Sequence, residues 1–126
     1  MSVRLNHTIV WCRDKRRSAA LLARILGGTP AIPFYNFMVV QLDNGVSLDF
    51  MDKIGPIASQ HYAFLIDESE FDATFSRMRD EGLSYWADPS KSRPNEINHN
   101  DGGRGVYFED LDGHLLEVIT RPYGGG

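Results

Sequence analysis

Four side chains able to bind a metal ion occur at matched places in the two halves of the chain. His7 and His61 each stand in a run with the alternation of a β-strand, and Asp49 and Glu117 each follow a glycine by four residues. Imidazole nitrogens and carboxylate oxygens together suit a divalent ion such as Fe(II), Mn, Ni or Zn. Three or four such ligands leave coordination positions open, which is typical of a catalytic metal rather than a structural one. The spacing does not choose among these metals.

Glu117 lies in a run whose two faces are both largely apolar. Side chains alternate along the expected strand, so Leu115, Glu117 and Ile119 share one face. An ionised carboxylate in such a position needs a cation, several hydrogen-bond donors or a proton. The other interpretation is that Glu117 pairs with Arg104 or Arg121 and that both histidines are structural.

The wider pattern predicts two units, each running strand, helix, strands, over about residues 3–51 and 60–120, with a linker at 52–59. The expected strands are 3–11, 35–42, 46–51, 60–66, 83–87, 106–109 and 115–120. The expected helices are 18–26, ended by Gly27-Gly28, and 70–81, with Ser69 as its cap and a stripe of Phe71, Phe75, Met78 and Gly82. The polar stretch 88–103, rich in Gly and Pro, is expected to be a functional lid.

The composition excludes several classes of protein. The chain has 126 residues, 42% hydrophobic and 24% charged, which suits one domain or two fused half-domains. A net charge of −4 gives no reason to expect nucleic acid or a membrane as partner. Cys12 is the only cysteine, so no intrachain disulfide forms and a reducing compartment fits. No apolar run has the length of a membrane span and no signal peptide is evident, so we expect a cytoplasmic protein.

Three segments together resemble a known family. Asn6-His7 in the first strand, His61-Tyr-Ala-Phe64 at the start of the second unit, and the closing segment 106–117 are similar to the vicinal oxygen chelate superfamily. That superfamily includes glyoxalase I, the fosfomycin-resistance thiol transferases, extradiol ring-cleaving dioxygenases and bleomycin-resistance proteins. The resemblance implies an α+β fold in which two β-α-β-β-β units form a curved mixed sheet, one domain over residues 1–126, and a homodimer.

The resemblance also implies roles for individual residues. His7, His61 and Glu117 would bind one divalent metal ion, and Asp49 would take the place of the fourth, carboxylate ligand of glyoxalase I. Tyr107 would face the substrate. In the commonest arrangement of the family, His7 of one chain would join His61 and Glu117 of the other, so that a homodimer shares its sites.

The turn of the closing hairpin decides whether Tyr107 is able to take that role. A two-residue turn sets Phe108 opposite Glu117, whereas a three-residue turn at 111–113, with positive φ at Gly113, sets Tyr107 there. The residue pattern alone permits both turns. We predict the three-residue turn because the resemblance places a site-facing tyrosine at this position.

The favoured function is a metal-dependent enzyme whose small substrate chelates the ion through adjacent oxygens. The ion would act as a Lewis acid, and Asp49 or Glu117 would be able to move a proton. A glyoxalase-like isomerase or lyase is the first expectation. A ring-cleaving dioxygenase, with Tyr107 and His99 beside the metal, is the second. The alternative of a different class is a non-catalytic protein that binds a small molecule or drug. Antibiotic thiol transfer is disfavoured because Ile9 is not a hydroxyl residue.

Overall fold

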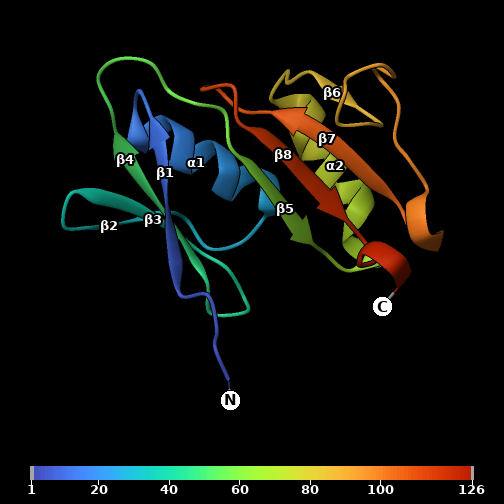
Figure 1. The fold of residues 1–126 in the computed structure, drawn as a ribbon, viewed down its shortest axis with the longest axis horizontal. Coiled ribbons are helices and arrows are strands. Elements are labelled where there is room, and N and C mark those ends of the chain that lie inside the picture. The colour runs from blue at the N-terminus through green and yellow to red at the C-terminus, as the bar shows by residue number, and fades with distance from the viewer. Residues whose placement is uncertain (1, 126) are drawn as a thin grey trace. The chain divides into compact units, whose positions relative to one another are not determined.

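The computed structural model describes residues 2–125, and the chain divides into two compact units, Met1–Ile57 and Ala58–Gly126 (Figure 1). The boundary between the units falls inside the linker predicted at 52–59. Each unit has one α-helix and its own four-stranded sheet. Within the described part of the chain, no helix is long and apolar enough to cross a membrane.

The first unit runs β1 (His7–Cys12), α1 (Lys15–Leu26), β2 (Ile32–Phe34), β3 (Phe37–Gln41) and β4 (Ser47–Asp52). Its strands lie in the order β1-β4-β3-β2. β1 is parallel to β4, and the other neighbouring strands are antiparallel. The helix and the two intervening strands give the chain enough length to return beside β1 in the same direction.

The second unit repeats this order. It runs β5 (His61–Leu65), the 3₁₀ helix η1 (Glu68–Glu70), α2 (Phe71–Asp80), β6 (Tyr85–Trp86), η2 (Asn100–Gly102), β7 (Gly105–Glu109), β8 (Leu115–Ile119) and η3 (Tyr123–Gly125). Its strands lie in the order β5-β8-β7-β6, with β5 parallel to β8. Both units are therefore β-α-β-β-β units with a mixed sheet, and the predicted α+β fold class is confirmed.

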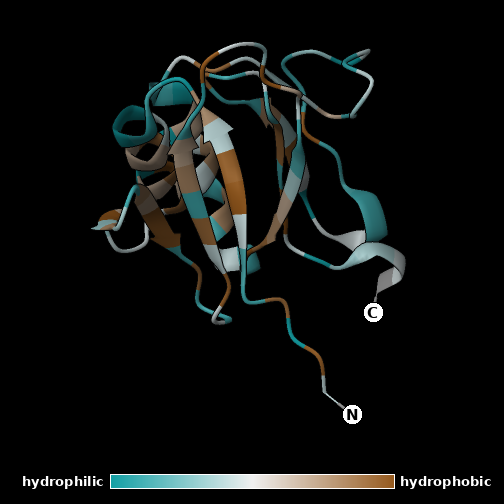
Figure 2. Cartoon of the chain, turned by 60° about the vertical axis from the view of Figure 1, so that its left-hand side comes forward, coloured by the Kyte–Doolittle hydropathy of each residue, from teal (hydrophilic) through white to brown (hydrophobic). Residues whose placement is uncertain are grey.

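In each unit the helix covers one face of the sheet and leaves the other face to the candidate ligands. In the first unit, Val10 and its register partner Phe50 are 2% exposed on the face that α1 covers. In the second unit, Phe75 of α2 contacts Tyr85, which pairs with Phe108 and so shares its face. Figure 2 shows the resulting change between hydrophobic and hydrophilic residues along single strands.

The elements of the first unit differ from the prediction in three places. α1 begins at Lys15 rather than at residue 18, because the Asp14 carboxylate accepts hydrogen bonds from the backbone N–H groups of Arg16 and Arg17. β1 begins at His7 rather than at residue 3. A third strand after the helix, β2, was missed because it contains Pro33, which an edge strand tolerates.

Two details of the second unit were also predicted wrongly. Ser69 is not the cap of the helix, because it lies inside η1 and α2 has no side-chain cap. Gly82 does not belong to the buried stripe, since it is exposed at φ 75° in the turn after α2. Phe71 and Met78 are buried as expected, at 0% and 1% exposure.

The closing hairpin has the predicted three-residue turn. Tyr107 pairs with Glu117, and Gly113 has a φ of 82°. The Asp110 carboxylate accepts hydrogen bonds from the backbone N–H groups of Asp112 and His114, each at 2.9 Å. This arrangement selects the register that turns Tyr107 toward the face of Glu117.

The stretch 88–103 is anchored to the second unit rather than loose. Asn98 is 4% exposed, donates to the backbone carbonyl of Ala87 at 2.8 Å and pairs with Gly105 through two backbone hydrogen bonds. Asp88 accepts hydrogen bonds from Ser90 and from other groups of its own turn. The contacts of Asn98 tie the stretch to the sheet, and those of Asp88 order its first turn.

Candidate metal centre

The second unit brings His61 and Glu117 together on the sheet face that α2 does not cover. β5 and β8 are parallel neighbours, and Ala63 pairs with Glu117, so His61 stands two residues earlier on the same face. Nε2 of His61 lies 3.3 Å from Oε1 of Glu117. Glu117 is 1% exposed and the His61 side chain 46%. The buried carboxylate is therefore in contact with a histidine that solvent and ligands reach.

The other ring nitrogen of His61 determines what Nε2 presents to Glu117. Nδ1 lies 2.8 Å from the backbone carbonyl oxygen of Leu115. A carbonyl oxygen only accepts hydrogen bonds, so Nδ1 carries a proton and Nε2 is the nitrogen that faces Glu117. In the imidazolium Nε2 donates to the carboxylate, whereas in the neutral ring two atoms with lone pairs face each other across 3.3 Å. A cation bound by both atoms would stabilise the second arrangement.

A divalent metal ion fits this gap. Two ligands that share an ion at about 2.0–2.2 Å, with an angle of roughly 90–109° at the ion, lie about 3.0–3.5 Å apart. The 3.3 Å between His61 and Glu117 falls in that range. A hydrogen bond from the second ring nitrogen to a backbone carbonyl is also how metal-binding histidines are usually oriented. The two side chains thus suit two adjacent ligands of one ion.

Two tyrosines complete the surroundings of Glu117. The ring of Tyr107 stacks on that of His61, with centroids 6.0 Å apart and an interplanar angle of 23°. The Tyr107 and Tyr123 hydroxyls lie 3.3 Å apart. The Tyr123 hydroxyl lies 2.7 Å from Oε1 and 2.9 Å from Oε2 of Glu117 and donates to this carboxylate. The buried carboxylate therefore has a strong donor from outside the sheet.

Both phenols are held in the protonated form. Burial, then the hydrogen bond with Tyr123 and the nearby charge of Glu117, raise the pKa of Tyr107 far above its ordinary value of 10.0. Burial, with the hydrogen bond and charge of Glu117, also raises the pKa of Tyr123. At neutral pH the two hydroxyls are therefore donors.

The first unit places His7 and Asp49 at the matching positions of its own sheet. Ile9 pairs with Asp49, as Ala63 pairs with Glu117 in the second unit. Asp49 is 9% exposed, and the Ser47 hydroxyl donates to its Oδ1 at 2.9 Å. His7 is exposed, and its Nδ1 lies 2.7 Å from Oδ1 of Asn6. The internal repeat thus extends to the candidate ligands.

Residues 4–118 match the family model of the Glyoxalase/Bleomycin resistance protein/Dioxygenase superfamily. The chain belongs to this superfamily. The resemblance to vicinal oxygen chelate proteins is thereby confirmed. Metallothiol transferase FosB of Shouchella clausii (strain KSM-K16) is 42% identical over 60 residues, which are 48% of this chain and 37% of that relative.

Solved structures of the superfamily match the whole chain. Oxidase ChaP-H1 is 61% identical with a TM-score of 0.95, over 98% of this chain and 100% of that one. Oxidase ChaP-H2 is 59% identical with the same TM-score, over 100% of both chains. The fosfomycin resistance protein FosX from Mesorhizobium loti is 23% identical with a TM-score of 0.71, over 97% of this chain and 95% of that one, and shares the fold.

The ligand set expected for this superfamily spans both units of the chain. His61, Glu117 and Tyr107 come together in the second unit, and His7 and Asp49 lie in the first. Among residues 2–125, no three His, Cys, Asp or Glu side chains are grouped so as to hold a metal ion. Each unit therefore holds one pair of candidate ligands, one histidine and one acid.

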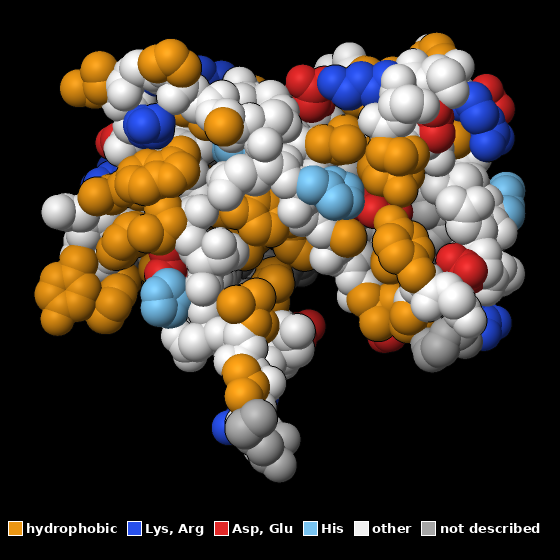
Figure 3. Space-filling view, in the orientation of Figure 1, with side chains coloured by type: hydrophobic (Ala, Val, Ile, Leu, Met, Phe, Trp, Pro, Cys, Tyr) orange, Lys and Arg blue, Asp and Glu red, His pale blue; other side chains and the backbone are white. Residues whose placement is uncertain are grey.

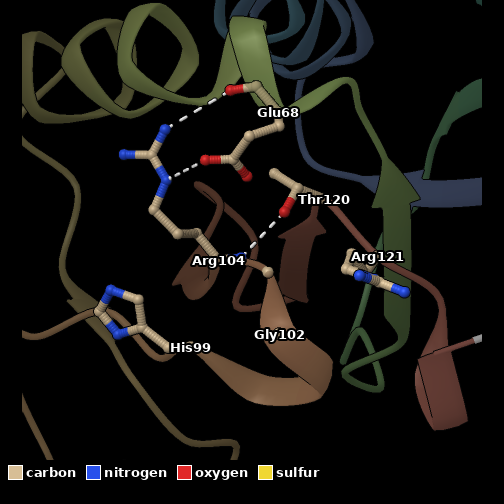
Figure 4. Close-up of a pocket in the computed structure, with 7 residues that line it drawn as sticks. Glu68, His99, Gly102, Arg104, Thr120 and Arg121 are labelled. Atoms are coloured by element: carbon tan, nitrogen blue, oxygen red, sulfur yellow. Dashed lines mark hydrogen bonds and ion pairs between the residues drawn. The ribbon is translucent and has the colours of Figure 1, made fainter.

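The remaining candidates lie elsewhere. Arg104 does not pair with Glu117, because its guanidinium bonds Glu68 and Asp72, each at 2.6 Å. His99 lines a separate pocket of the second unit, of about 450 Å³, with Arg104 between it and Glu68 (Figure 4). Cys12 is buried in β1.

Apolar side chains surround the acid of the first unit. Ile32 and Phe34 of β2 and Trp11 of β1 lie on the same sheet face as Asp49 and are 59%, 58% and 38% exposed. Figure 3 shows histidine and acidic side chains among hydrophobic ones in both units. Such a face suits a flat, largely apolar molecule with a few polar groups.

Two residues near the site were missed from the sequence. Tyr123 belongs to a short glycine-rich tail with no periodic pattern, so nothing in its spacing indicated contact with Glu117. His114 is fully buried, and its Nδ1 accepts a hydrogen bond from the backbone N–H of Gln60 at 3.0 Å. His114 therefore holds the starts of β5 and β8 together.

Proposed function

We propose that this protein is a divalent-metal-dependent enzyme that acts on a small, oxygen-chelating substrate. His7, His61 and Glu117 would hold the ion, and Asp49 is a fourth candidate ligand. The observation that carries the proposal is the close approach of two potential ligand atoms, His61 Nε2 and Glu117 Oε1, 3.3 Å apart, with Nδ1 of His61 held by the Leu115 carbonyl. Burial of a carboxylate at 1% exposure is costly unless a cation or hydrogen-bond donors balance its charge.

Within that class, we propose an oxidase or dioxygenase rather than the isomerase or lyase expected first. Two structures that match 98–100% of the chain, at 61% and 59% identity, are named oxidases. The apolar face around Asp49, with Trp11 and Phe34, also suits an aromatic substrate. An isomerase or lyase remains the second candidate, supported by membership of a superfamily whose name includes glyoxalase.

The chain's own residues have distinct tasks in this proposal. A bound ion would supply Lewis acidity toward two substrate oxygens. The carbonyl of Leu115 keeps the His61 ring turned toward Glu117. The protonated phenol of Tyr107, which pairs with Glu117 across the hairpin and lies 3.3 Å from the Tyr123 hydroxyl, would donate a hydrogen bond to a substrate oxygen in place of Tyr123. Asp49, held by Ser47, is the second carboxylate able to accept a proton.

A homodimer would complete the ligand set. The family arrangement would join His7 of one protomer to His61 and Glu117 of its partner, which agrees with the division of the candidates between two units. The homodimer and a cytoplasmic location are proposals that accompany this function.

Metal binding is the decisive test. Purified protein is stripped with EDTA and titrated with Fe(II), Mn, Ni or Zn, with affinity read by calorimetry and by the shift in Tm. We expect His61→Ala and Glu117→Gln to lose most of the affinity, and His99→Ala, an exposed histidine outside the pair, to keep it. Wild-type affinity in the first two variants, or no metal-dependent shift in the wild type, contradicts the proposal. The second result would favour the non-catalytic binding protein.

The reaction class has its own test. Oxygen uptake by the metal-loaded protein is measured with a panel of catechols and fused-ring phenols. Uptake that requires both the metal and the aromatic substrate supports the oxidase. Isomerisation of α-oxoaldehyde–thiol adducts without oxygen uptake would favour the second candidate.

A further inference from the structure

The chain after β8 folds back so that Tyr123 covers Glu117. The single hydroxyl proton of Tyr123 is shared between both carboxylate oxygens, 2.7 and 2.9 Å away. Oε1 is also the carboxylate oxygen that lies 3.3 Å from His61 Nε2. An ion held by these two atoms would therefore bind an oxygen that already accepts the Tyr123 proton.

Breaking the contact between Tyr123 and Glu117 costs little free energy. The side chain of Tyr123 is 63% exposed, so little apolar surface is buried by the ring. In the segment η3 to which it belongs, the backbone N–H of Gly124 donates to the side-chain carboxylate of Asp101 at 3.1 Å. Asp101 is itself in the left-handed region, at φ 56°. Besides Glu117, the Tyr123 hydroxyl lies near the Tyr107 hydroxyl, at a longer distance of 3.3 Å.

The base of the tail is firmly held, which limits how far it moves. Thr120 exchanges two hydrogen bonds with the backbone of Arg104, at 2.9 and 3.0 Å. Gly103 allows this approach, because a Cβ there would lie 2.5 Å from Oγ1 of Thr120 and 2.9 Å from Cγ of Arg121. Arg104 therefore anchors the tail at its start, with room left by Gly103, and the part beyond residue 121 carries the tyrosine.

We propose that Tyr123 is a displaceable cap on Glu117 that sets the metal affinity of the site. Without metal it supplies the donor that the buried carboxylate needs, and it leaves Glu117 when an ion binds there. This inference rests on the proposed function, in which Glu117 is a ligand. It assigns a role in the site to the C-terminal segment.

The proposal predicts the sign of the effect of Tyr123→Phe, which deletes only the hydroxyl. The metal-free protein loses a hydrogen bond to a buried charge, whereas the metal-loaded protein has already given it up. Tm of the EDTA-treated variant should therefore fall, Tm with saturating Mn²⁺ should approach that of the wild type, and Mn²⁺ should bind roughly 10- to 100-fold more tightly. Tyr35→Phe, at a tyrosine 86% exposed in the first unit, is the matched control and should change neither quantity.

A second variant weakens the attachment of the tail without changing Tyr123 itself. Asp101→Gly keeps a residue suited to φ 56° and removes the acceptor of the Gly124 N–H, so Mn²⁺ affinity should rise, by less than in Tyr123→Phe. Mn²⁺ binding is followed by the EPR signal of the free ion. Unchanged or weaker binding in Tyr123→Phe, while Glu117→Gln loses the metal, overturns this inference and leaves the proposed function standing. Wild-type binding in Glu117→Gln overturns the proposed function itself.

Discussion

Replacing Glu117 by glutamine should stabilise the metal-free protein while abolishing most of its metal affinity. The carboxylate is 1% exposed, and one of its oxygens faces the accepting Nε2 of His61 at 3.3 Å. An amide at the same position removes a desolvated charge and turns an NH₂ group toward that nitrogen, while its oxygen still accepts from Tyr123. With the His61 ring neutral, a contact between two acceptors thus becomes a hydrogen bond.

The size of the gain follows from these two changes. One neutral hydrogen bond contributes about 1 kcal/mol, and relief of the buried charge adds a similar amount, partly offset by a weaker bond from Tyr123. We expect the free energy of unfolding to rise by about 1–2 kcal/mol, which is roughly 4–8 °C in Tm for a chain of this size.

The assay is thermal and urea unfolding of EDTA-treated protein, compared with titration of the same samples with Mn²⁺. Glu96→Gln is the control, since Glu96 is exposed and lies 3.6 Å from Arg93, an ion pair of little consequence. A fall in the stability of metal-free Glu117→Gln would refute the reasoning. It would mean that Tyr123 and a protonated His61 stabilise the ionised carboxylate more than its burial destabilises it, so that Glu117 serves the fold.

Three further predictions concern other parts of the chain. If subunits share sites, mixing His7→Ala with Glu117→Gln protein and allowing exchange should restore metal binding to about one quarter of the sites, whereas sites within one chain would restore none. Hydrogen bonds from Ser90 and a second serine hold the pKa of Asp88 well below its ordinary value of 3.8. Its stabilisation is therefore present above that pH and lost as pH falls toward the lower folded-state pKa, and Asp88→Asn should flatten the acid limb of a stability–pH curve. Asn98→Ala should cost about 1–3 kcal/mol in urea unfolding, because its buried amide bonds a backbone carbonyl at 2.8 Å, and unchanged stability would show that the stretch 88–103 is not anchored there.

The acids at matched positions of the two units, Asp49 and Glu117, accept hydrogen bonds from different kinds of donor. Asp49 is held by a hydroxyl two residues away on its own strand, whereas Glu117 is held by a tyrosine from beyond its sheet. The short-range contact leaves Asp49 little freedom, because Ser47 belongs to the same strand. The contact of Glu117 comes from η3, a segment outside the sheet. This difference favours Glu117 as the acid whose environment responds to a ligand.

Much of the architecture was predictable from local signals. Alternation of apolar residues located β5 and β8 to within a residue or two, and Gly27 marked the end of α1 because it adopts φ 71° at the helix terminus. Local signals failed at β2. Pro33 indicated a loop, but an edge strand that pairs only with β3 tolerates a proline. They also failed at the start of α1. The charged residues before position 18 were predicted to lie outside the helix, but the cap by Asp14 lets it begin at Lys15.

For the site, the sequence by itself determined which side chains have metal chemistry and which strands carry them. The alternation of side chains, a property of each strand alone, placed Glu117 among apolar neighbours and His61 on a strand face. Only the tertiary structure decided the register of the closing hairpin, the pairing of Arg104 with Glu68 rather than Glu117, and the return of Tyr123 onto the carboxylate. The pairing of Arg104 and the return of Tyr123 depend on contacts between segments distant in the chain, whose energies no local pattern contains. The register depends on which turn the Asp110 carboxylate stabilises, and the alternation of residues permits both turns.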